Sequence, residues 1–492
     1  MVNNLVYLVN AGNDPKYTKS VIHGTSFPPL GVISLGTAVQ EWKPDWDVKV
    51  FDGQVTEEQD ILDGIKADRP GIVGVSVLST SYQNALNIAR ATKEAGAVTI
   101  FGNDQATITG TNMLAARSEI DYICTADTGE KPFVQFLEFI EGKRPIDTVT
   151  KLMYRMQDGT IRHNKGLPEL EPRDRYEILD QIPIPDRTLL PEDVREKYLQ
   201  NYRAAYPDEK VTGATTINRF RGCSNAKKPC VYCGITDLTI RTSSPEVFWK
   251  DVRAAKEIGA NRLLEAGDSF SSVPRYLKKL ISAKPDDIDF SAFVYTSARD
   301  ITTELASIYK KIGIVRANMG LDSGDNIILR RLKGNRESVE QSARAVKILS
   351  KAGINSYASF VLGGPGETKD SIENTVQFTK WLIDKSLVDG TEAQPLFPGI
   401  NSRSGRMLLN PLMAEKMARK EGWKILDRDK LYSMPEKWSR HENPDPEEIS
   451  RDWATIFSEV NYDDLLGIAA EIQEYSLRHG IRTGSTWIPC DD

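Results

Sequence analysis

The sequence predicts an α/β protein with two successive parallel sheets and a mainly helical C-terminal region. Three observations lead to this fold class. The chain has 492 residues, which suggests about three domains. Short apolar runs alternate with helical patterns over residues 1–145 and again over 213–392, which is typical of parallel sheets covered by helices. The last hundred residues are charged yet hold four of the eight tryptophans, so we expect them to be folded.

Composition excludes several classes of protein. A net charge of −6 and a pI near 5.6 argue against a nucleic-acid binder, which would carry a basic patch. The sequence contains no run of 18 apolar residues, so we expect no membrane span. The N-terminus lacks the basic region of a signal peptide. Five cysteines are too few for a disulfide scaffold. We therefore expect a cytoplasmic protein with no membrane or nucleic-acid partner.

Residues 1–145 are predicted to form a doubly wound, flavodoxin-like domain. Such sheets bind ligands outside the carboxyl ends of their strands. In this sequence those ends are rich in small and polar residues, as a ligand-binding rim would be. The strands are expected at 5–10, 48–53, 71–79, 98–103 and 121–126, and the helices at 31–42, 81–96, around 112–118 and at 130–142.

The rest of the chain divides into three parts. Prolines interrupt residues 146–212, which we interpret as a linker with a short helix near 191–203. Residues 213–392 are predicted to form a partial barrel of six β/α units, with its chemistry at the carboxyl ends of the strands. The barrel strands are expected at 215–220, 262–267, 289–296, 314–321, 356–364 and around 388–394. The barrel helices are expected at 245–259, 273–283, 302–312, 338–352 and 369–384. Residues 393–492 should form a helical cap that selects the substrate, with helices at 410–420, 446–458 and 463–479.

Three cysteines lie within eleven residues, directly after the first predicted barrel strand. Cys223, Cys230 and Cys233 have the spacing C-x6-C-x2-C. A structural zinc site would take four protein ligands, and no fourth Cys or His lies nearby in the sequence. Three thiolates would leave one position of a metal centre open for a small molecule, and nearby basic residues would help to keep the thiols ionised. A zinc knuckle or three free thiols are the alternatives.

This loop resembles the cluster-binding loop of the radical S-adenosylmethionine (radical SAM) superfamily. There, three cysteines bind a [4Fe–4S] cluster whose free iron chelates S-adenosylmethionine. Arg221-Gly222-Cys223 and the aromatic Tyr232 match this loop, while the usual spacing, C-x3-C-x2-C, is three residues shorter. Later strand ends also match in order, including a Gly-Pro-Gly-Glu-Thr turn. The resemblance implies S-adenosylmethionine contacts from Tyr232, Gly267, Asp268, Asp322, Ser323, Gly364, Gly366 and Glu367. Asp322 stands where a Glu is more usual.

The N-terminal region resembles the cobalamin-binding domain of the cobalamin-dependent radical SAM enzymes. Its landmarks are Pro-Pro-Leu-Gly before the first helix, Val-Gly-Val-Ser in the third strand and Gly-Glu after the fifth. No histidine follows Asp52, so the resemblance implies cobalamin without a lower axial histidine. Asn103 replaces the second glycine of the usual Gly-Gly pair, where the backbone would approach the ligand closely. The implied cobalamin contacts are Pro29, Leu30, Asp52, Ser76, Leu78, Gly102, Thr107, Gly129 and Glu130.

Taken together, the resemblance implies an enzyme that uses a [4Fe–4S] cluster, S-adenosylmethionine and cobalamin. A 5′-deoxyadenosyl radical would abstract hydrogen from an unactivated carbon, and methylcobalamin would deliver a methyl group. The substrate would be a small metabolite or a natural-product precursor. An electron donor such as flavodoxin or ferredoxin would serve as partner. Cyclisation, ring rearrangement and P-methylation are alternatives within the family, and a non-catalytic iron–sulfur or zinc protein is the alternative of another class.

Overall fold

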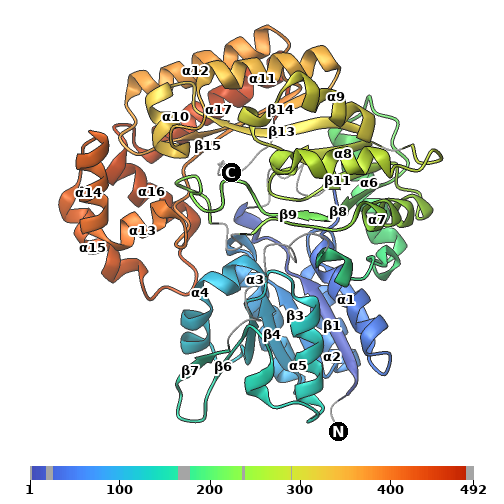
Figure 1. Ribbon diagram of the computed structural model, residues 1–492. Coiled ribbons are helices and arrows are strands. Elements are labelled where there is room, and N and C mark those ends of the chain that lie inside the picture. Colours follow the sequence, from blue (N-terminus) through green and yellow to red (C-terminus); the bar gives the residue numbers. More distant parts are fainter. Residues whose placement is uncertain (1–2, 18–25, 165–177, 235–238, 290, 484–492) are drawn as a thin grey trace. The chain divides into compact units, whose positions relative to one another are not determined.

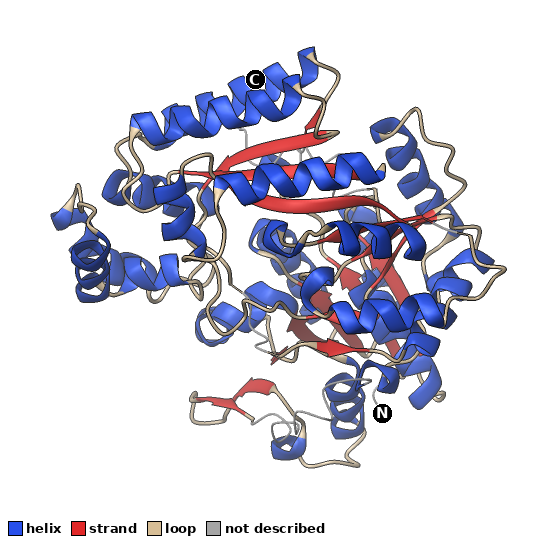
Figure 2. Cartoon of the chain, turned by 45° about the horizontal axis from the view of Figure 1, so that its top comes forward, coloured by secondary structure: helices blue, strands red, loops and turns tan. Residues whose placement is uncertain are grey.

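The computed structural model describes residues 3–17, 26–164, 178–234, 239–289 and 291–483 (Figure 1). The chain divides into two compact units. The first comprises residues 1–217, 250–261 and 440–444, and the second comprises 218–249, 262–439 and 445–492. Each unit has its own sheet, and helices alternate with strands in both (Figure 2).

The first unit contains the predicted doubly wound sheet. Its strand order is β2-β1-β3-β4-β5-β6-β7, so the first five strands have the flavodoxin-like order. These five pair in parallel, while β6 and β7 add antiparallel strands within the range predicted as a linker. The strands are β1 (Leu5–Asn10), β2 (Asp47–Asp52), β3 (Ile72–Ser76), β4 (Val98–Gly102), β5 (Tyr122–Cys124), β6 (Leu152–Arg155) and β7 (Ile161–His163).

Helices bury an apolar core on each face of this sheet. Alternation along β1 shows the two faces, because Tyr7 and Val9 join one core and Val6 and Leu8 join the other. Helices α2 (Glu58–Asp68), α3 (Tyr82–Glu94) and α4 (Asn103–Ala116) cover the first face. Helices α1 (Leu30–Trp42), α5 (Glu130–Ile140) and α6 (Glu192–Ala205) cover the second.

Strand register places the predicted rim at one edge of the sheet. Asn10 of β1 lies opposite both Asp52 of β2 and Ser76 of β3, and Ser76 lies opposite Gly102 of β4. The carboxyl ends of four strands therefore form one row across the sheet. Three of the predicted cobalamin contacts belong to this row.

The second unit contains a parallel sheet with the strand order β16-β15-β14-β13-β12-β11. A hairpin of β9 (Phe220–Arg221) and β10 (Arg241–Thr242) precedes it, after β8 (Ala214–Ile217) at the end of the first unit. The strands of the sheet are β11 (Arg262–Glu265), β12 (Ser291–Tyr295), β13 (Ile314–Asp322), β14 (Asn355–Leu362), β15 (Gly390–Pro395) and β16 (Arg482–Thr483). Its helices are α7 (Pro245–Glu257), which crosses the boundary between the units, α8 (Pro274–Ser282), α9 (Thr303–Ile312), α10 (Asn326–Lys333), α11 (Val339–Ala352) and α12 (Lys369–Asp384).

The C-terminal region is helical, as predicted. Trp423, Trp438 and Trp453 are buried in one apolar core with β14 and α10, whereas Trp487 and Cys490 lie outside the described residues. Its helices are α13 (Arg403–Leu409), α14 (Pro411–Glu421), α15 (Arg428–Trp438), α16 (Pro446–Phe457) and α17 (Tyr462–Arg478). Within the described ranges, no helix is both long and apolar enough to cross a membrane.

Candidate functional site

The cysteine loop begins at a sharp turn after β9. Gly222 has φ +92°, and a Cβ at this position would clash with the carbonyl oxygen of Thr239. Only glycine adopts this conformation without strain, and only glycine fits the space. The glycine of Arg-Gly-Cys therefore aims the chain away from the hairpin before Cys223.

The three thiols are partly exposed and chemically suited to an iron–sulfur cluster. Burial raises the pKa of Cys223, and it raises the pKa of Cys230 to about 12, which the positive charge of Lys333 opposes. The neighbouring Cys233 raises the pKa of Cys230 further. The pKa of Cys223 is raised by the charges of Asp268 and Asp300 and lowered by that of Arg299. Among the residues that the structure describes, no three His, Cys, Asp or Glu side chains are gathered around one point. Three soft thiol donors on one loop still fit a cluster with one open iron, because thiolates are its usual ligands.

One end of the loop is fixed to β13. The Tyr232 hydroxyl donates to Asp322 over 2.7 Å, and Asp322 is paired with Lys333 of α10 at 3.0 Å. Lys333 also reaches Glu337 at 2.8 Å and the carbonyl oxygen of Gly320. Asp322 is 2% exposed with φ +63°, an unusual conformation that Asp tolerates better than most residues. Two of the predicted S-adenosylmethionine contacts, Tyr232 and Asp322, thus touch each other.

The other end of the loop is fixed to the segment after β11. Asp268 accepts a hydrogen bond from the backbone N–H of Gly222 at 2.7 Å. Glu265 accepts from the N–H groups of Arg219, Phe220 and Gly267, and burial raises its pKa to about 8. The predicted contacts Gly267 and Asp268 therefore lie directly beside the start of the cysteine loop.

The residues that lengthen the loop have their own contacts. Arg336 donates to the Asn225 side chain at 2.9 Å and to the carbonyl of Lys228 at 2.5 Å. Arg299 donates to the Ser224 hydroxyl at 2.7 Å. Nothing in the sequence indicates the role of Arg336, because no motif relates it to a loop 108 residues earlier. The long C-x6-C spacing is accommodated by side chains rather than left loose.

The Gly-Pro-Gly turn follows β14 and is held by the C-terminal helices. Trp453 donates to the carbonyl of Gly363 at 2.8 Å, and a Cβ on Gly366 would clash with Trp423. Glu367 accepts from the N–H of Gly364 at 2.6 Å, while its second carboxylate oxygen is buried and has no hydrogen-bond partner among the described residues. Burial raises the pKa of Glu367 to about 7. Ser323, the remaining predicted contact, is buried against Thr375 of α12 at 3.1 Å.

The rim of the first unit is built differently, mostly from backbone and small side chains. Pro29 caps α1, which begins at Leu30, and Leu78 is 40% exposed. Asp52 is fully buried, and its carboxylate accepts from Asn10, Tyr198 and the N–H of Gln54. Asp52 therefore supports the rim from within, since its hydrogen-bonding capacity is engaged inside the unit.

Asn103 occupies the position where the family has a second glycine. It adopts φ +76°, a region that asparagine enters more readily than other side chains. Its side chain donates to Ser76 at 2.9 Å and accepts from the N–H of Asp104 at 2.7 Å. The glycine-like backbone is thus preserved, while Gly102 ends β4 and Thr107 lies half-buried in α4.

Glu130 offers this rim an unsatisfied acceptor. It is 4% exposed and follows Gly129 at the start of α5; Ser34 donates to one carboxylate oxygen at 2.6 Å. The other oxygen is buried without a hydrogen-bond partner among the described residues. Buried polar atoms are nearly always satisfied, so this oxygen, with the small residues of the rim, fits a ligand rich in amide donors such as cobalamin.

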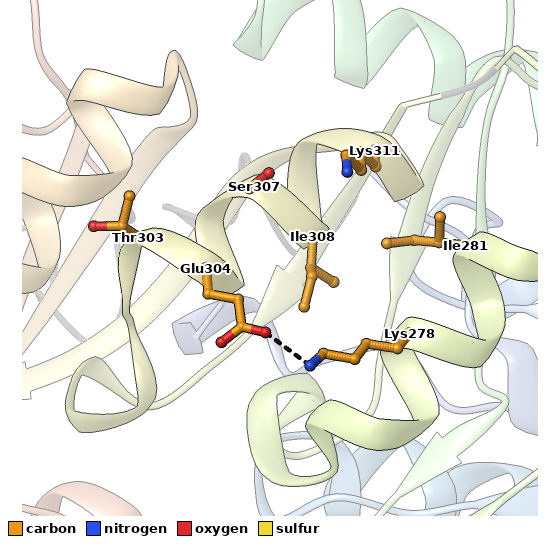
Figure 3. A pocket seen from close by; sticks show the side chains of 7 residues that line it. All are labelled: Lys278, Ile281, Thr303, Glu304, Ser307, Ile308 and Lys311. Carbon is orange, nitrogen blue, oxygen red and sulfur yellow. Dashed lines mark ion pairs between the residues drawn. The ribbon is translucent and has the colours of Figure 1, made fainter.

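A surface groove of about 510 Å³ lies between α8 and α9. Lys278 and Glu304 face each other across it at 2.7 Å, with Lys311 at its far end (Figure 3). Both partners are more than half exposed, so the pair contributes little to stability. None of the predicted site residues lines this groove.

Two protein families each match one part of the chain. The radical SAM superfamily matches residues 217–379, and the B12 binding domain matches residues 23–137. The chain therefore carries a radical SAM domain, which implies a [4Fe–4S] cluster and S-adenosylmethionine, and a B12-binding domain, which implies cobalamin.

Individual proteins are similar to this chain over most of its length, across both domains. An uncharacterized methyltransferase of Pyrococcus horikoshii is 26% identical over 385 residues, covering 76% of this chain and 78% of the relative. The structure resembles that of the radical S-adenosylmethionine methyltransferase TsrM from Kitasatospora setae, with a TM-score of 0.65 and 19% identity over 85% of this chain and 77% of TsrM. It also resembles the cobalamin-dependent S-adenosylmethionine radical enzyme OxsB, with a TM-score of 0.63 and 18% identity over 86% of this chain and 62% of OxsB. The fold and the two cofactor-binding domains predicted from the sequence are thus confirmed.

Proposed function

We propose that this chain, which belongs to the cobalamin-dependent radical SAM enzymes, transfers a methyl group to a carbon atom of a small molecule. The observation that carries the proposal is the presence, in one chain, of an anchored three-cysteine loop and a strand-end rim suited to cobalamin. Two similar proteins are named as methyltransferases, and one of them is 26% identical, against 23% for an anaerobic magnesium-protoporphyrin IX monomethyl ester cyclase of Rubrivivax gelatinosus; this favours methyl transfer over cyclisation. An external electron donor such as flavodoxin or ferredoxin would supply the reducing equivalents.

When bound, the cluster supplies an electron to cleave S-adenosylmethionine, and cobalamin supplies a carrier for the methyl group. The thiols of Cys223, Cys230 and Cys233 would hold the cluster. The positive charge of Lys333 favours the thiolate form of Cys230, which is the form that binds metal.

The remaining residues position these groups. Asp268 and Asp322 fix the two ends of the loop, and they would also face S-adenosylmethionine beside it. The Gly364–Glu367 turn would present backbone groups to the adenine. In the first unit, Ser76, Gly102 and Glu130 would contact cobalamin, with Asp52 holding the strand ends in register.

The test is anaerobic reconstitution with iron, sulfide and hydroxocobalamin, followed by metal analysis. About four irons and one cobalt per chain are expected. On addition of S-adenosylmethionine and a strong reductant, 5′-deoxyadenosine and S-adenosylhomocysteine should both form. Iron without cobalt would contradict methyl transfer through cobalamin, and one zinc without iron would overturn the assignment of the three cysteines.

A matched pair of variants tests the cobalamin rim separately. Glu130→Gln should weaken cobalamin binding about fivefold to tenfold, because it removes one acceptor worth about 1 kcal/mol. Glu138→Gln, in the same helix but paired with Arg144 on the surface, is the control. Equal cobalamin affinity in the two variants would exclude Glu130 from the site.

A further inference from the structure

One face of the sheet of the second unit is covered by helices, and the other face carries a group of polar residues. Phe360 of β14 contacts Phe378 of α12, and Thr391 of β15 contacts Ser476 of α17, so this face is covered by helices. The residues between them point the opposite way, because side chains alternate along a strand. On that second face, β12 to β15 carry Tyr295, Asn318, Tyr357, Ser359, Glu392 and Gln394.

A parallel sheet buried on both faces is normally apolar on both. The polar face therefore indicates the lining of an internal space. Tyr295 supports this, because it is 44% exposed although its strand, β12, lies between β11 and β13.

Strand register gathers part of this face into two adjacent rows. Tyr295, Asn318, Tyr357 and Gly390 lie opposite one another across four strands. The next row contains Gly320, Ser359 and Glu392. Gly320 precedes the predicted S-adenosylmethionine contact Asp322 by two residues, or about 7 Å along the strand. Glu392 lies two strands away from Gly320, about 10 Å across the sheet, so its cluster and the predicted contact Asp322 belong to the same sheet.

One tyrosine contacts Glu392, and a second lies on the same face of the sheet. The Tyr357 hydroxyl donates to its carboxylate at 3.2 Å, and the negative charge of Glu392 raises the pKa of Tyr295 further, after burial. Gly390 makes this arrangement possible, since a Cβ there would clash with the Tyr357 ring. A glycine at position 390 therefore leaves the space in which the Tyr357 ring lies beside Glu392.

No cation of the described residues neutralises Glu392. Burial raises the pKa of Glu392, and the Tyr357 hydroxyl alone opposes this. The three arginines on the same face have other partners. Arg482, which lies opposite Gly390, pairs with Asp389 at 3.4 Å. Arg316 pairs with Asp389 and stacks on Phe293, and Arg262 contacts Phe293 and Ser291. Glu392 is half-buried, so water solvates its carboxylate only in part, and a ligand cation would stabilise it further.

We propose that Glu392, Tyr357 and Tyr295 form a subsite for a protonated amino group of the substrate. The carboxylate supplies the opposite charge, and the tyrosine rings supply the electron-rich faces that attract an ammonium group. The substrate class is therefore a small cationic amine. This assignment rests on the proposed function, because it places the subsite on the sheet that carries the predicted S-adenosylmethionine contact Asp322.

Calorimetric titration of the reconstituted full-length chain with two probes tests the subsite. Phenethylamine is cationic at pH 7, and N-acetylphenethylamine has the same ring without the charge. We expect phenethylamine to bind and its acetylated form to bind at least tenfold more weakly. Glu392→Gln should weaken phenethylamine binding by about tenfold or more and leave the acetylated probe unaffected. Tyr357→Phe keeps the ring, so its loss should be about threefold or less.

Glu373→Gln, on the exposed side of α12, is the control and should bind both probes as the native chain does. Iron content and thermal midpoint of every variant show whether it has folded. No phenethylamine binding by the native chain, or equal binding by Glu392→Gln, would overturn the subsite. Glu392-dependent binding in a chain that never cleaves S-adenosylmethionine would support the subsite and contradict the proposed function, so the two failures are distinct.

Discussion

The two predicted cofactor regions are built on opposite principles. In the second unit, charged side chains connect the predicted residues to one another: Asp322 joins Tyr232 to Lys333, and Asp268 holds Gly222. In the first unit, the rim is a row of strand ends. There the carboxylate of Asp52 accepts hydrogen bonds from inside the unit, and one oxygen of Glu130 has no hydrogen-bond partner in the part of the chain that the structure describes.

This difference follows from what each region must hold. A cluster is bound by three flexible thiols, so their loop needs anchors from several strands. A large flat ligand such as cobalamin needs surface and space, which a rigid sheet edge supplies without a network. Substitutions in the second unit should therefore disturb several functions together, whereas those in the first should have separable effects.

The largest effect is expected from the cysteines themselves. Cys230→Ala should abolish iron incorporation and S-adenosylmethionine cleavage, because two thiolates cannot hold the cluster. Cobalamin binding should persist, since the B12-binding domain matches another part of the chain. Iron and cobalt analysis with product chromatography measures both. Cys124→Ala, in the core of the first unit, should retain iron; parallel loss of cobalt in Cys230→Ala would show that the two regions are not separable.

The acidic residues give the most direct comparison. Asp322→Asn should lower S-adenosylmethionine cleavage about tenfold to a hundredfold, as expected for a partner that orients a metal-binding loop. Asp52→Asn should instead lower the stability of the first unit by about 1–2 kcal/mol, because it replaces an acceptor of three hydrogen bonds. Thermal unfolding and initial rates distinguish the two outcomes. Equal rate losses would remove the contrast between the regions.

Sequence patterns predicted most of the elements because hydrophobic periodicity specifies them. Among the elements that were not predicted are the helices α2, α10, α13 and α15 and the strand β6. Two of them show the cause. Helix α2 has only Ile61 and Ile65 as buried residues among charged ones, so its apolar stripe was too narrow to recognise. The β6 strand is a short run within a proline-interrupted segment, and its pairing with β5 depends on contacts about 30 residues apart.

The candidate sites show the same limit. Gly222, Asp268 and Asp322 lie beside the cysteine loop as the motif order implied. The tertiary partners could not be predicted, because Arg336 and Glu392 act across distances that no local pattern encodes. Asn103 could be predicted only in part. The sequence shows that it replaces a glycine, but only the structure shows its positive φ and its hydrogen bond to Ser76.

A pH series at Glu367 tests how strongly burial acts in the second unit. Its pKa is raised from 4.5 to about 7, so the folded state resists ionisation. Stability from this group is complete below pH 4.5, falls as pH rises towards 7, and stays low above that value. Glu367→Gln should remove the fall, opening a gap of about 2 kcal/mol in favour of the variant between pH 5 and pH 8. Thermal midpoints at these pH values decide; parallel curves for both proteins would mean that the carboxylate is already ionised or solvated.

The smallest expected effect concerns the rim of the first unit. Asn103→Ala should destabilise this unit by about 1–2 kcal/mol, since alanine at φ +76° is strained and the bond to Ser76 is lost. Asn103→Gly removes the same bond without the strain, so it should cost less and should keep the backbone turn after β4. If the rim binds cobalamin through backbone and small side chains, the glycine variant should retain cobalt at least as well as the native chain. Loss of cobalt in Asn103→Gly would show that the asparagine side chain itself takes part in binding, and the contrast with the charged network of the second unit would then be smaller than the structure suggests.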